Sequence, residues 1–292
     1  MKPVFTYLDE PTLEPQQGCE WANKMVLNPA IVRDPDDENT MHMLFRATGP
    51  WSKKRKEGKL DPYPIFLGYA KSEDKGKTWE ADFSRPALAP LLQEEEDKIY
   101  ITDINGNKVR DYSNGCIEDP RIFEVENEWY VTAACRIFPP GPYWMVDQDP
   151  PVHTRYMYVP DWARTFNEED KDKAPFHYTA FKNNTVTVLY KLNLDKLKNG
   201  LYEEAFTYVC PLTEGHISDN RDVFIFPEKM LIDGKWQYVM LHRPEKPAAF
   251  KDGDKVKTPS IYLAAAERIE DFATTKATHH LLCTSTFSWE DE

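Results

Sequence analysis

Short stretches of hydrophobic residues, bounded by Pro, Gly, Asn and Asp, recur along the whole chain. Such stretches are typical of β-strands, and they predict strands at residues 41–47, 65–70, 121–125, 129–136, 185–190, 223–226, 236–242 and 260–266. The best helical pattern is short, at residues 192–206, and Gly200 interrupts it. Strands in succession without crossover helices favour a sandwich, a barrel or a propeller. We therefore expect an all-β fold.

Three segments of the chain repeat one arrangement. In each, a proline is followed by a turn and by a strand that ends in an arginine 16 or 17 residues later, and a further strand comes after it. The pairs are Pro29 and Arg46, Pro120 and Arg136, and Pro227 and Arg243. Radial repetition of such β-units makes a β-propeller. We expect a single domain over residues 1–292 that covers about three blades of a propeller.

A propeller brings equivalent positions of its blades together, because the innermost strands all begin at the same face of the central channel. Asn28, Asp119 and Glu228 lie at or next to the three prolines. The three arginines end the second strand of each repeat. We expect these acids and guanidinium groups to surround one polar pocket.

Composition excludes several classes of partner. The chain carries 49 acidic and 36 basic residues, a net charge of −13, which argues against nucleic acid or an anionic membrane as the main partner. No apolar run is long enough for a membrane span, and the first residues lack a secretory core. The five cysteines are far apart and include no Cys-x-x-Cys pair, which indicates reduced thiols in a cytoplasmic protein.

No cofactor site is evident in the sequence. It contains no P-loop, no dinucleotide fingerprint and no Ser-His-Asp arrangement. Residues 34–39 look like a calcium loop but lack its glycine and its terminal glutamate, so we interpret them as a polar turn and expect no metal. Aromatic residues make up 13% of the chain, and many stand beside prolines and carboxylates, a setting that suits sugars as well as a core.

Several motifs together resemble glycoside hydrolase family 130. They are Asn-Pro-Ala at 28–30, Leu-Phe-Arg-Ala at 44–47, Gly-Cys-Ile-Glu-Asp-Pro-Arg at 115–121, Asn-Arg-Asp at 220–222, Phe-Pro-Glu-Lys at 226–229 and Met-Leu-His-Arg-Pro at 240–244. The match extends from about Asn28 to Trp289. The resemblance implies a five-bladed β-propeller that acts on β-mannosides. Most members are inverting phosphorylases that release α-mannose 1-phosphate, and a minority are inverting hydrolases, notably of β-1,2-mannosides.

The resemblance implies that Asp119 is the general acid. Glu118 and Arg121 beside it are neighbours that suit an acid, whereas the alternative is an Asp-Pro turn cap. Inverting hydrolysis also needs a carboxylate base. Our candidates are Glu228, with a sugar-hydroxyl ligand as the alternative, and Glu267, with an exposed strand-end acid as the alternative. Glu245 is a third candidate.

The remaining polar candidates bind the substrate or a phosphate. Arg46, Arg121 and Arg243 present forked donors for paired hydroxyls, or form structural salt bridges with Asp119, Asp222 or Glu228. Asn28 and Asp222 are candidate sugar ligands, and Asp222 alternatively orients Arg221. A Pro- and Asp-rich insertion at residues 139–173 is a candidate wall of the sugar cleft, with a loop packed on the rim as the alternative.

Three positions separate hydrolysis from phosphorolysis. By the resemblance, Arg221 and His242 align with phosphate-binding positions of the phosphorylases. Thr187 stands roughly where those enzymes place a further arginine, and the loss of that cation favours hydrolysis.

We therefore predict an inverting glycosidase that cleaves β-mannosidic, in particular β-1,2-, linkages in manno-oligosaccharides. One alternative is a β-mannoside phosphorylase, with inorganic phosphate as its co-substrate. The other is a sugar-binding propeller without turnover. A homo-oligomer stays open.

Overall fold

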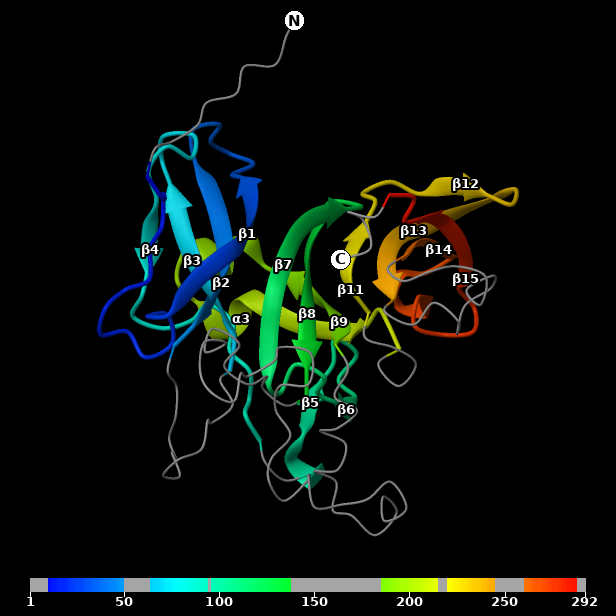
Figure 1. Ribbon diagram of the computed structural model, residues 1–292, viewed down its shortest axis with the longest axis horizontal. Coiled ribbons are helices and arrows are strands. Elements are labelled where there is room, and N and C mark those ends of the chain that lie inside the picture. The colour runs from blue at the N-terminus through cyan, green and yellow to red at the C-terminus, as the bar shows by residue number, and fades with distance from the viewer. Residues whose placement is uncertain are drawn as a thin grey trace, which may run out of the picture.

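The computed structural model describes residues 10–49, 64–93, 96–137, 185–214, 220–244 and 260–287, and these residues are mainly in β-strands. Three antiparallel sheets follow one another along the chain and lie side by side (Figure 1). The first sheet has the order β1-β2-β3-β4, with the bounds β1 Met25–Arg33, β2 Met41–Thr48, β3 Phe66–Ser72 and β4 Glu80–Asp82. The predicted all-β fold is therefore confirmed.

The other two sheets repeat this plan. The second has the order β10-β9-β8-β7, with the bounds β7 Cys116–Val125, β8 Glu128–Arg136, β9 Val186–Leu192 and β10 Phe206–Pro211. The third has the order β11-β13-β14-β15, with β12 beside β13, and its bounds are β11 Asn220–Ile225, β12 Met230–Ile232, β13 Lys235–Pro244, β14 Ser260–Ala266 and β15 Thr278–Thr284. A small ribbon, β5 Tyr100–Thr102 and β6 Lys108–Arg110, precedes the second sheet. In each large sheet, the strand that comes first in the chain forms one edge.

All eight predicted strands are present, with shifts at their ends. The largest shift is at β7, which begins at Cys116 and not at Arg121. Pro120 does not end this strand, because it lies at an irregular position of an edge strand, where no N–H donor is required. The predicted helix is divided at Gly200, whose φ of +71° ends α2 (Leu194–Lys198) before α3 (Tyr202–Ala205). No helix in the described part of the chain is long and apolar enough to cross a membrane.

Backbone hydrogen bonds link consecutive sheets in the same way. The N–H of Ile117, in β7, donates to the carbonyl of Ile65 at 3.1 Å, just before β3. The N–H of Asn220, in β11, donates to the carbonyl of Thr185 at 3.1 Å, just before β9. In both cases the third strand of one sheet holds the start of the first strand of the next. The repeat inferred from the sequence is therefore also present in the backbone.

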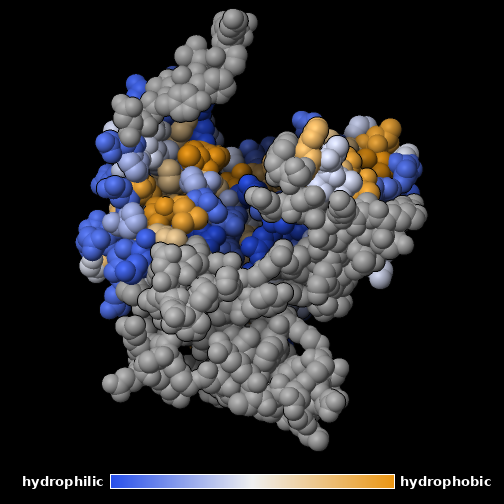
Figure 2. Space-filling model, in the orientation of Figure 1, coloured by the Kyte–Doolittle hydropathy of each residue, from blue (hydrophilic) through white to orange (hydrophobic). Residues whose placement is uncertain are grey.

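The three edge strands β1, β7 and β11 lie together near the middle of the molecule, because β1 and β11 both contact β7 (Figure 1). A hollow with hydrophilic residues on its floor separates the first and third sheets on one face (Figure 2). The described residues form three sheets that do not close into a ring. The propeller and its number of blades therefore stay predictions.

Hydrophobic clusters fill the spaces between the sheets. One joins the first and second sheets with α2 and α3, through side chains such as Leu44, Tyr69, Tyr190 and Leu197. A second joins the second and third sheets. A third covers the far side of the first sheet, where Trp21 packs on Phe45. The third sheet leaves large apolar side chains exposed, namely Phe224, Trp236, Ile261 and Leu282.

The helices α2 and α3 form a wedge against the first sheet. Lys198 Nζ lies 3.0 Å from Asp34 Oδ2, and His42 Nε2 lies 2.8 Å from the same oxygen. Tyr202 donates a hydrogen bond to Asp82 at 2.8 Å. These polar contacts hold the helices against the first sheet, and the apolar cluster fills the space between them.

Replacing Gly68 is expected to disrupt the far side of the first sheet. An added Cβ would lie 2.2 Å from the ring of Phe45, its cross-strand partner, and 2.8 Å from Trp21. We expect Gly68→Ala to lower the free energy of unfolding by about 1–3 kcal/mol, as overpacking does, in a urea titration. Phe45→Leu in the same background should recover part of this loss, and additive losses would contradict the clash.

Acid should weaken the attachment of the wedge. Burial alone would raise the pKa of Asp34, but hydrogen bonds from His42, from the Asp36 N–H and from Lys198 outweigh it, so this pKa lies well below its usual value. A folded-state pKa below the unfolded one stabilises the fold above about pH 4, and this contribution is lost as the pH falls. Asp34→Asn should therefore cost about 2 kcal/mol at pH 7 and progressively less below pH 4, measured by denaturant titration at each pH. A cost that does not change with pH would contradict this assignment.

Candidate active site

The first strand of each sheet carries one β-bulge. The pairing register slips between Leu27 and Ala30 in β1, between Glu118 and Arg121 in β7, and between Arg221 and Phe224 in β11. Each bulge contains one residue other than glycine with a left-handed backbone, and these residues are Asn28 (φ +48°), Asp119 (φ +53°) and Asp222 (φ +60°). Bulges of this kind re-aim a side chain and recur at active sites.

Asn and Asp are the side chains that tolerate this backbone best. Because β1, β7 and β11 are edge strands, one extra residue does not disrupt a second neighbouring strand. Asn28, Asp119 and Asp222 are therefore equivalent positions of the three sheets.

Asp119 is held from the first sheet. Asn28 Nδ2 donates to Asp119 Oδ1 at 2.7 Å, and Arg46 Nη1 donates to the same oxygen at 3.0 Å. The other end of the Arg46 guanidinium, Nη2, lies 2.8 Å from Oε2 of the buried Glu118. The Asp119 side chain itself is 21% exposed. One buried arginine thus bridges two neighbouring carboxylates and leaves Asp119 accessible.

Asp222 is held by one arginine of the third sheet, to which it belongs, and by one arginine of the second sheet. Arg243 donates to Asp222 Oδ2 through Nε at 2.9 Å and through Nη2 at 2.7 Å. Arg121 Nη2 lies 3.8 Å from Oδ1. All three side chains remain partly exposed, so the screened ion pairs chiefly orient the groups.

Seven predicted site residues thus share one region, at or next to the bulges: Asn28, Arg46, Asp119, Arg121, Arg221, Asp222 and Arg243. Arg221 is adjacent to Asp222 and donates to Thr185 Oγ1 at 3.1 Å. The buried Glu118 belongs to the same group, although the sequence suggested it only as a neighbour of Asp119.

His242 lies deeper than the rest. It is 1% exposed, its Nδ1 lies 3.0 Å from Asn220 Nδ2, and its Nε2 lies 3.1 Å from His279 Nδ1. Burial, together with the charge of His279, lowers the pKa of His242 to about 3. Thr187 is also buried and donates to the carbonyl of Asn220 at 3.3 Å. At neutral pH neither of these side chains supplies a positive charge.

The structure does not bring Glu228 or Glu267 to Asp119. Glu228 is exposed beside Lys229, which pairs with Glu126 in the β7–β8 turn at 3.2 Å. That turn is seven residues from Asp119 along β7, roughly 20 Å in an extended strand. Glu267 is exposed after β14 and pairs with Lys235, at the start of β13. Glu245 and residues 139–173 lie outside the described residues.

The expected equivalence between Glu228 and Asp119 is therefore wrong. It relied on the prolines, but the third bulge contains Val223 where the first two contain Pro29 and Pro120. The arginine series differs as well. Arg46 and Arg243 lie opposite the residue that precedes each bulge, whereas Ala134 holds that position in the second sheet and Arg136 pairs with Cys116.

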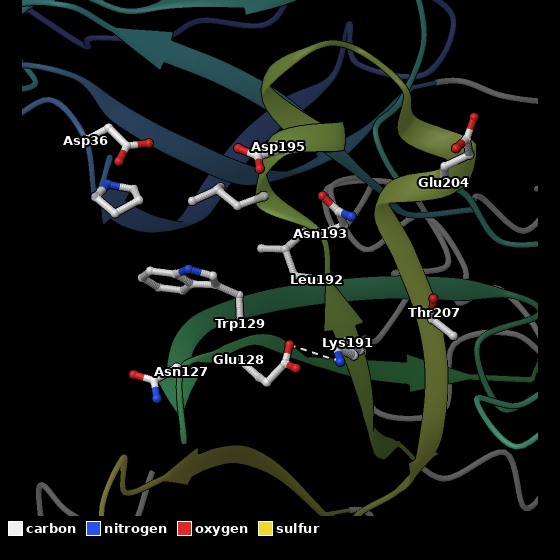
Figure 3. A pocket seen from close by; sticks show the side chains of 12 residues that line it. Asp36, Asn127, Glu128, Trp129, Lys191, Leu192, Asn193, Asp195, Glu204 and Thr207 are labelled. Atoms are coloured by element: carbon white, nitrogen blue, oxygen red, sulfur yellow. Dashed lines mark ion pairs between the residues drawn. The ribbon is translucent and has the colours of Figure 1, made fainter.

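A cavity of about 480 Å³ lies elsewhere, at the β7–β8 turn (Figure 3). Trp129 points into it, and four carboxylate residues line it: Asp36, Glu128, Asp195 and Glu204. Glu128 pairs with Lys191 at 2.9 Å. None of the predicted site residues lines this cavity, so we place the candidate active site at the bulges.

Comparisons with known proteins find similar solved structures but no sequence match. No family model matches the chain, and no curated protein does. Similar solved structures include β-1,2-mannobiose phosphorylase from Listeria innocua (TM-score 0.44, 15% identity, covering 87% of this chain and 58% of that one). Another is a glycoside hydrolase of the GH130 mannoside phosphorylase family that targets β-1,2-mannosidic linkages in Candida mannan (TM-score 0.48, 13% identity, covering 94% of this chain and 59% of that one).

An α-L-arabinofuranosidase from Lactobacillus brevis is similar to a comparable degree (TM-score 0.46, 12% identity, covering 95% of this chain and 59% of that one). The structural neighbours are thus glycoside hydrolases and phosphorylases, and they include the family that the sequence motifs resemble. The chain spans slightly less than three-fifths of the length of these three structures. The site residues themselves must therefore support any activity.

We expect the imidazole of His242 to stay neutral over the working range of pH. With a pKa of about 3, it should show no protonation between pH 8 and pH 5 in ¹H–¹⁵N NMR correlations. The His242 resonances are assigned by their loss in His242→Gln. A titration of His242 centred above pH 5 would contradict the neutral, buried arrangement.

Proposed function

We propose that the chain carries the active site of an inverting glycosidase that hydrolyses β-mannosidic bonds, in particular β-1,2 linkages of manno-oligosaccharides. The observation that supports this is the gathering of Asn28, Asp119 and Asp222 at equivalent bulges of three neighbouring strands. The mannoside preference rests on the resemblance of the sequence motifs. In this proposal the three sheets are blades of a five-bladed propeller.

Asp119 is the general acid in this proposal. It is partly exposed, and its carboxylate is fixed from behind by Asn28 and Arg46. It delivers a proton to the glycosidic oxygen as the bond from that oxygen to C1 of mannose breaks. The leaving sugar departs as a neutral alcohol.

Asp222 is the second carboxylate, and it replaces Glu228 and Glu267 as the base. It takes a proton from the water that attacks C1 on the face opposite the leaving group, so a β-mannoside yields α-mannose. Arg243 and Arg121 hold its two oxygens in place. Arg121 has donors left over for sugar hydroxyls, since a guanidinium carries five N–H groups.

Phosphorolysis is the second candidate because arginines are abundant at the bulges. Among the described residues four of them, Arg46, Arg121, Arg221 and Arg243, face three carboxylates, which leaves an excess of one positive charge when all three are ionised and of two when Asp119 carries the proton of the general acid. A phosphate dianion would use all of this excess. The buried, neutral His242 and Thr187 add none, so hydrolysis is the better-supported reaction.

Replacing Asp119 should greatly slow turnover but leave the binding of the sugar unchanged. We expect Asp119→Asn to lower kcat on β-1,2-mannobiose by about 10²–10⁴-fold, the usual contribution of a general acid. Glu228→Gln, which alters a distant carboxylate, should stay within about twofold of the unchanged protein. The assay measures mannose release, and calorimetry measures binding.

The same assay separates the alternatives when it is run with and without inorganic phosphate. Release of α-mannose 1-phosphate that strictly requires phosphate would replace hydrolysis by phosphorolysis. Binding of mannosides without turnover under either condition would identify a binding protein. The absence of both binding and turnover would refute the proposal.

A further inference from the structure

We infer that Asn28 is a positioning residue that makes Oδ2 of Asp119 the oxygen that carries and delivers the proton. The inference rests on the proposed function and assigns the direction of proton delivery within that site. It also replaces the sequence-based interpretation of Asn28 as a sugar ligand.

The two partners of Asp119 Oδ1 are both donors. The Nδ2 of an asparagine amide and the guanidinium of an arginine have hydrogens to give and no lone pair to accept one. Asn28 Nδ2 and Arg46 Nη1 approach the same oxygen at 2.7 Å and 3.0 Å. A proton on Oδ1 would face these hydrogens directly. When Asp119 is protonated, its proton therefore resides on Oδ2.

Oδ2 is the open side of the carboxyl group. Within the described parts of the chain no group donates a hydrogen bond to it, and the Asp119 side chain is 21% exposed. A leaving-group oxygen can therefore approach Oδ2 without displacing a donor that belongs to the described residues. This is the geometry that a general acid needs.

An amide is required at position 28 because it is neutral. Of the three equivalent bulge residues, two are carboxylic acids and Asn28 is not. A carboxylate 2.7 Å from Asp119 would compete with it for a proton, since two like charges at that distance cannot both persist. The amide orients Asp119 without this competition.

The backbone of Asn28 is also suited to this task. Its φ of +48° turns the side chain out of the sheet toward β7, across a separation of 91 residues in sequence. Asn127, in the β7–β8 turn, has a similar φ of +63° but belongs to no part of the proposed site. Asn127 therefore offers a matched control for backbone effects.

The test compares Asn28→Gly and Asn28→Asp with Asn127→Gly. Glycine keeps the left-handed backbone and removes only the amide. We expect Asn28→Gly to lower kcat on β-1,2-mannobiose about 10–100-fold, with KM within about twofold, and Asn127→Gly to change neither. A higher KM with unchanged kcat would restore the role of sugar ligand and overturn the inference.

The pH profile supplies a second readout. In Asn28→Asp the shared proton should move the alkaline limb of the kcat profile to higher pH by about one unit or more. In the Asp119→Asn background, Asn28→Gly should have no further effect on kcat, because it acts through Asp119. An unchanged profile, or fully additive losses, would overturn the inference.

A third readout requires no turnover. The ¹³C resonance of the Asp119 carboxyl group, assigned by its loss in Asp119→Asn, should show in Asn28→Asp the coupled titration of two carboxyl groups that share a proton. A titration curve identical in Asn28→Asp and in the unchanged protein would overturn the inference. If the protein proves inactive on mannosides, the proposed function fails while this titration still decides the role of Asn28.

Discussion

An edge strand has hydrogen-bonding neighbours on one side only, and the arrangement at the bulges depends on this freedom. In β1, β7 and β11 the register slips by one residue, and the pairing with the neighbouring strand resumes on either side of the slip. The residue at the slip takes a left-handed backbone that Asn and Asp accept at modest cost. The same slip in a central strand would have to be matched by two neighbours. The candidate site is therefore built from the outermost strand of each sheet.

The forces that hold the sheets together differ from those that orient the site. Apolar clusters and two equivalent backbone hydrogen bonds set the spacing of the sheets. The ion pairs of Arg46 and Arg243 then fix carboxylates whose environments differ, because Arg46 is buried and Arg243 is partly exposed. Removing a partner from the buried set leaves a charge without compensation, which costs far more than at the surface. Asp119 thus depends more strongly on its surroundings than Asp222 does.

Much of this arrangement could be predicted from the sequence, because strands and turns leave local patterns. The eight predicted strands, the break at Gly200 and the grouping of Asn28, Arg46 and Asp119 follow from hydrophobic runs and repeated motifs. The proline pattern predicts a wrong position for Glu228, because proline occurs in only two of the three bulges, whereas the bulge itself is a property of strand pairing. Val223 gives no local signal of a bulge. The neutral state of His242 depends on burial by residues distant in sequence and could not be predicted.

The wedge formed by α2 and α3 has a consequence for how such a protein can change. It is twelve residues long in total, from Leu194 to Ala205. It packs between the two sheets that present Asn28 and Asp119, and it is attached to the first of them through Lys198 on Asp34 and Tyr202 on Asp82. A longer or shorter wedge would change the distance between the Asn28 amide and the Asp119 carboxyl group. The activity could thus be altered by substitutions far from the site, with every reacting group unchanged.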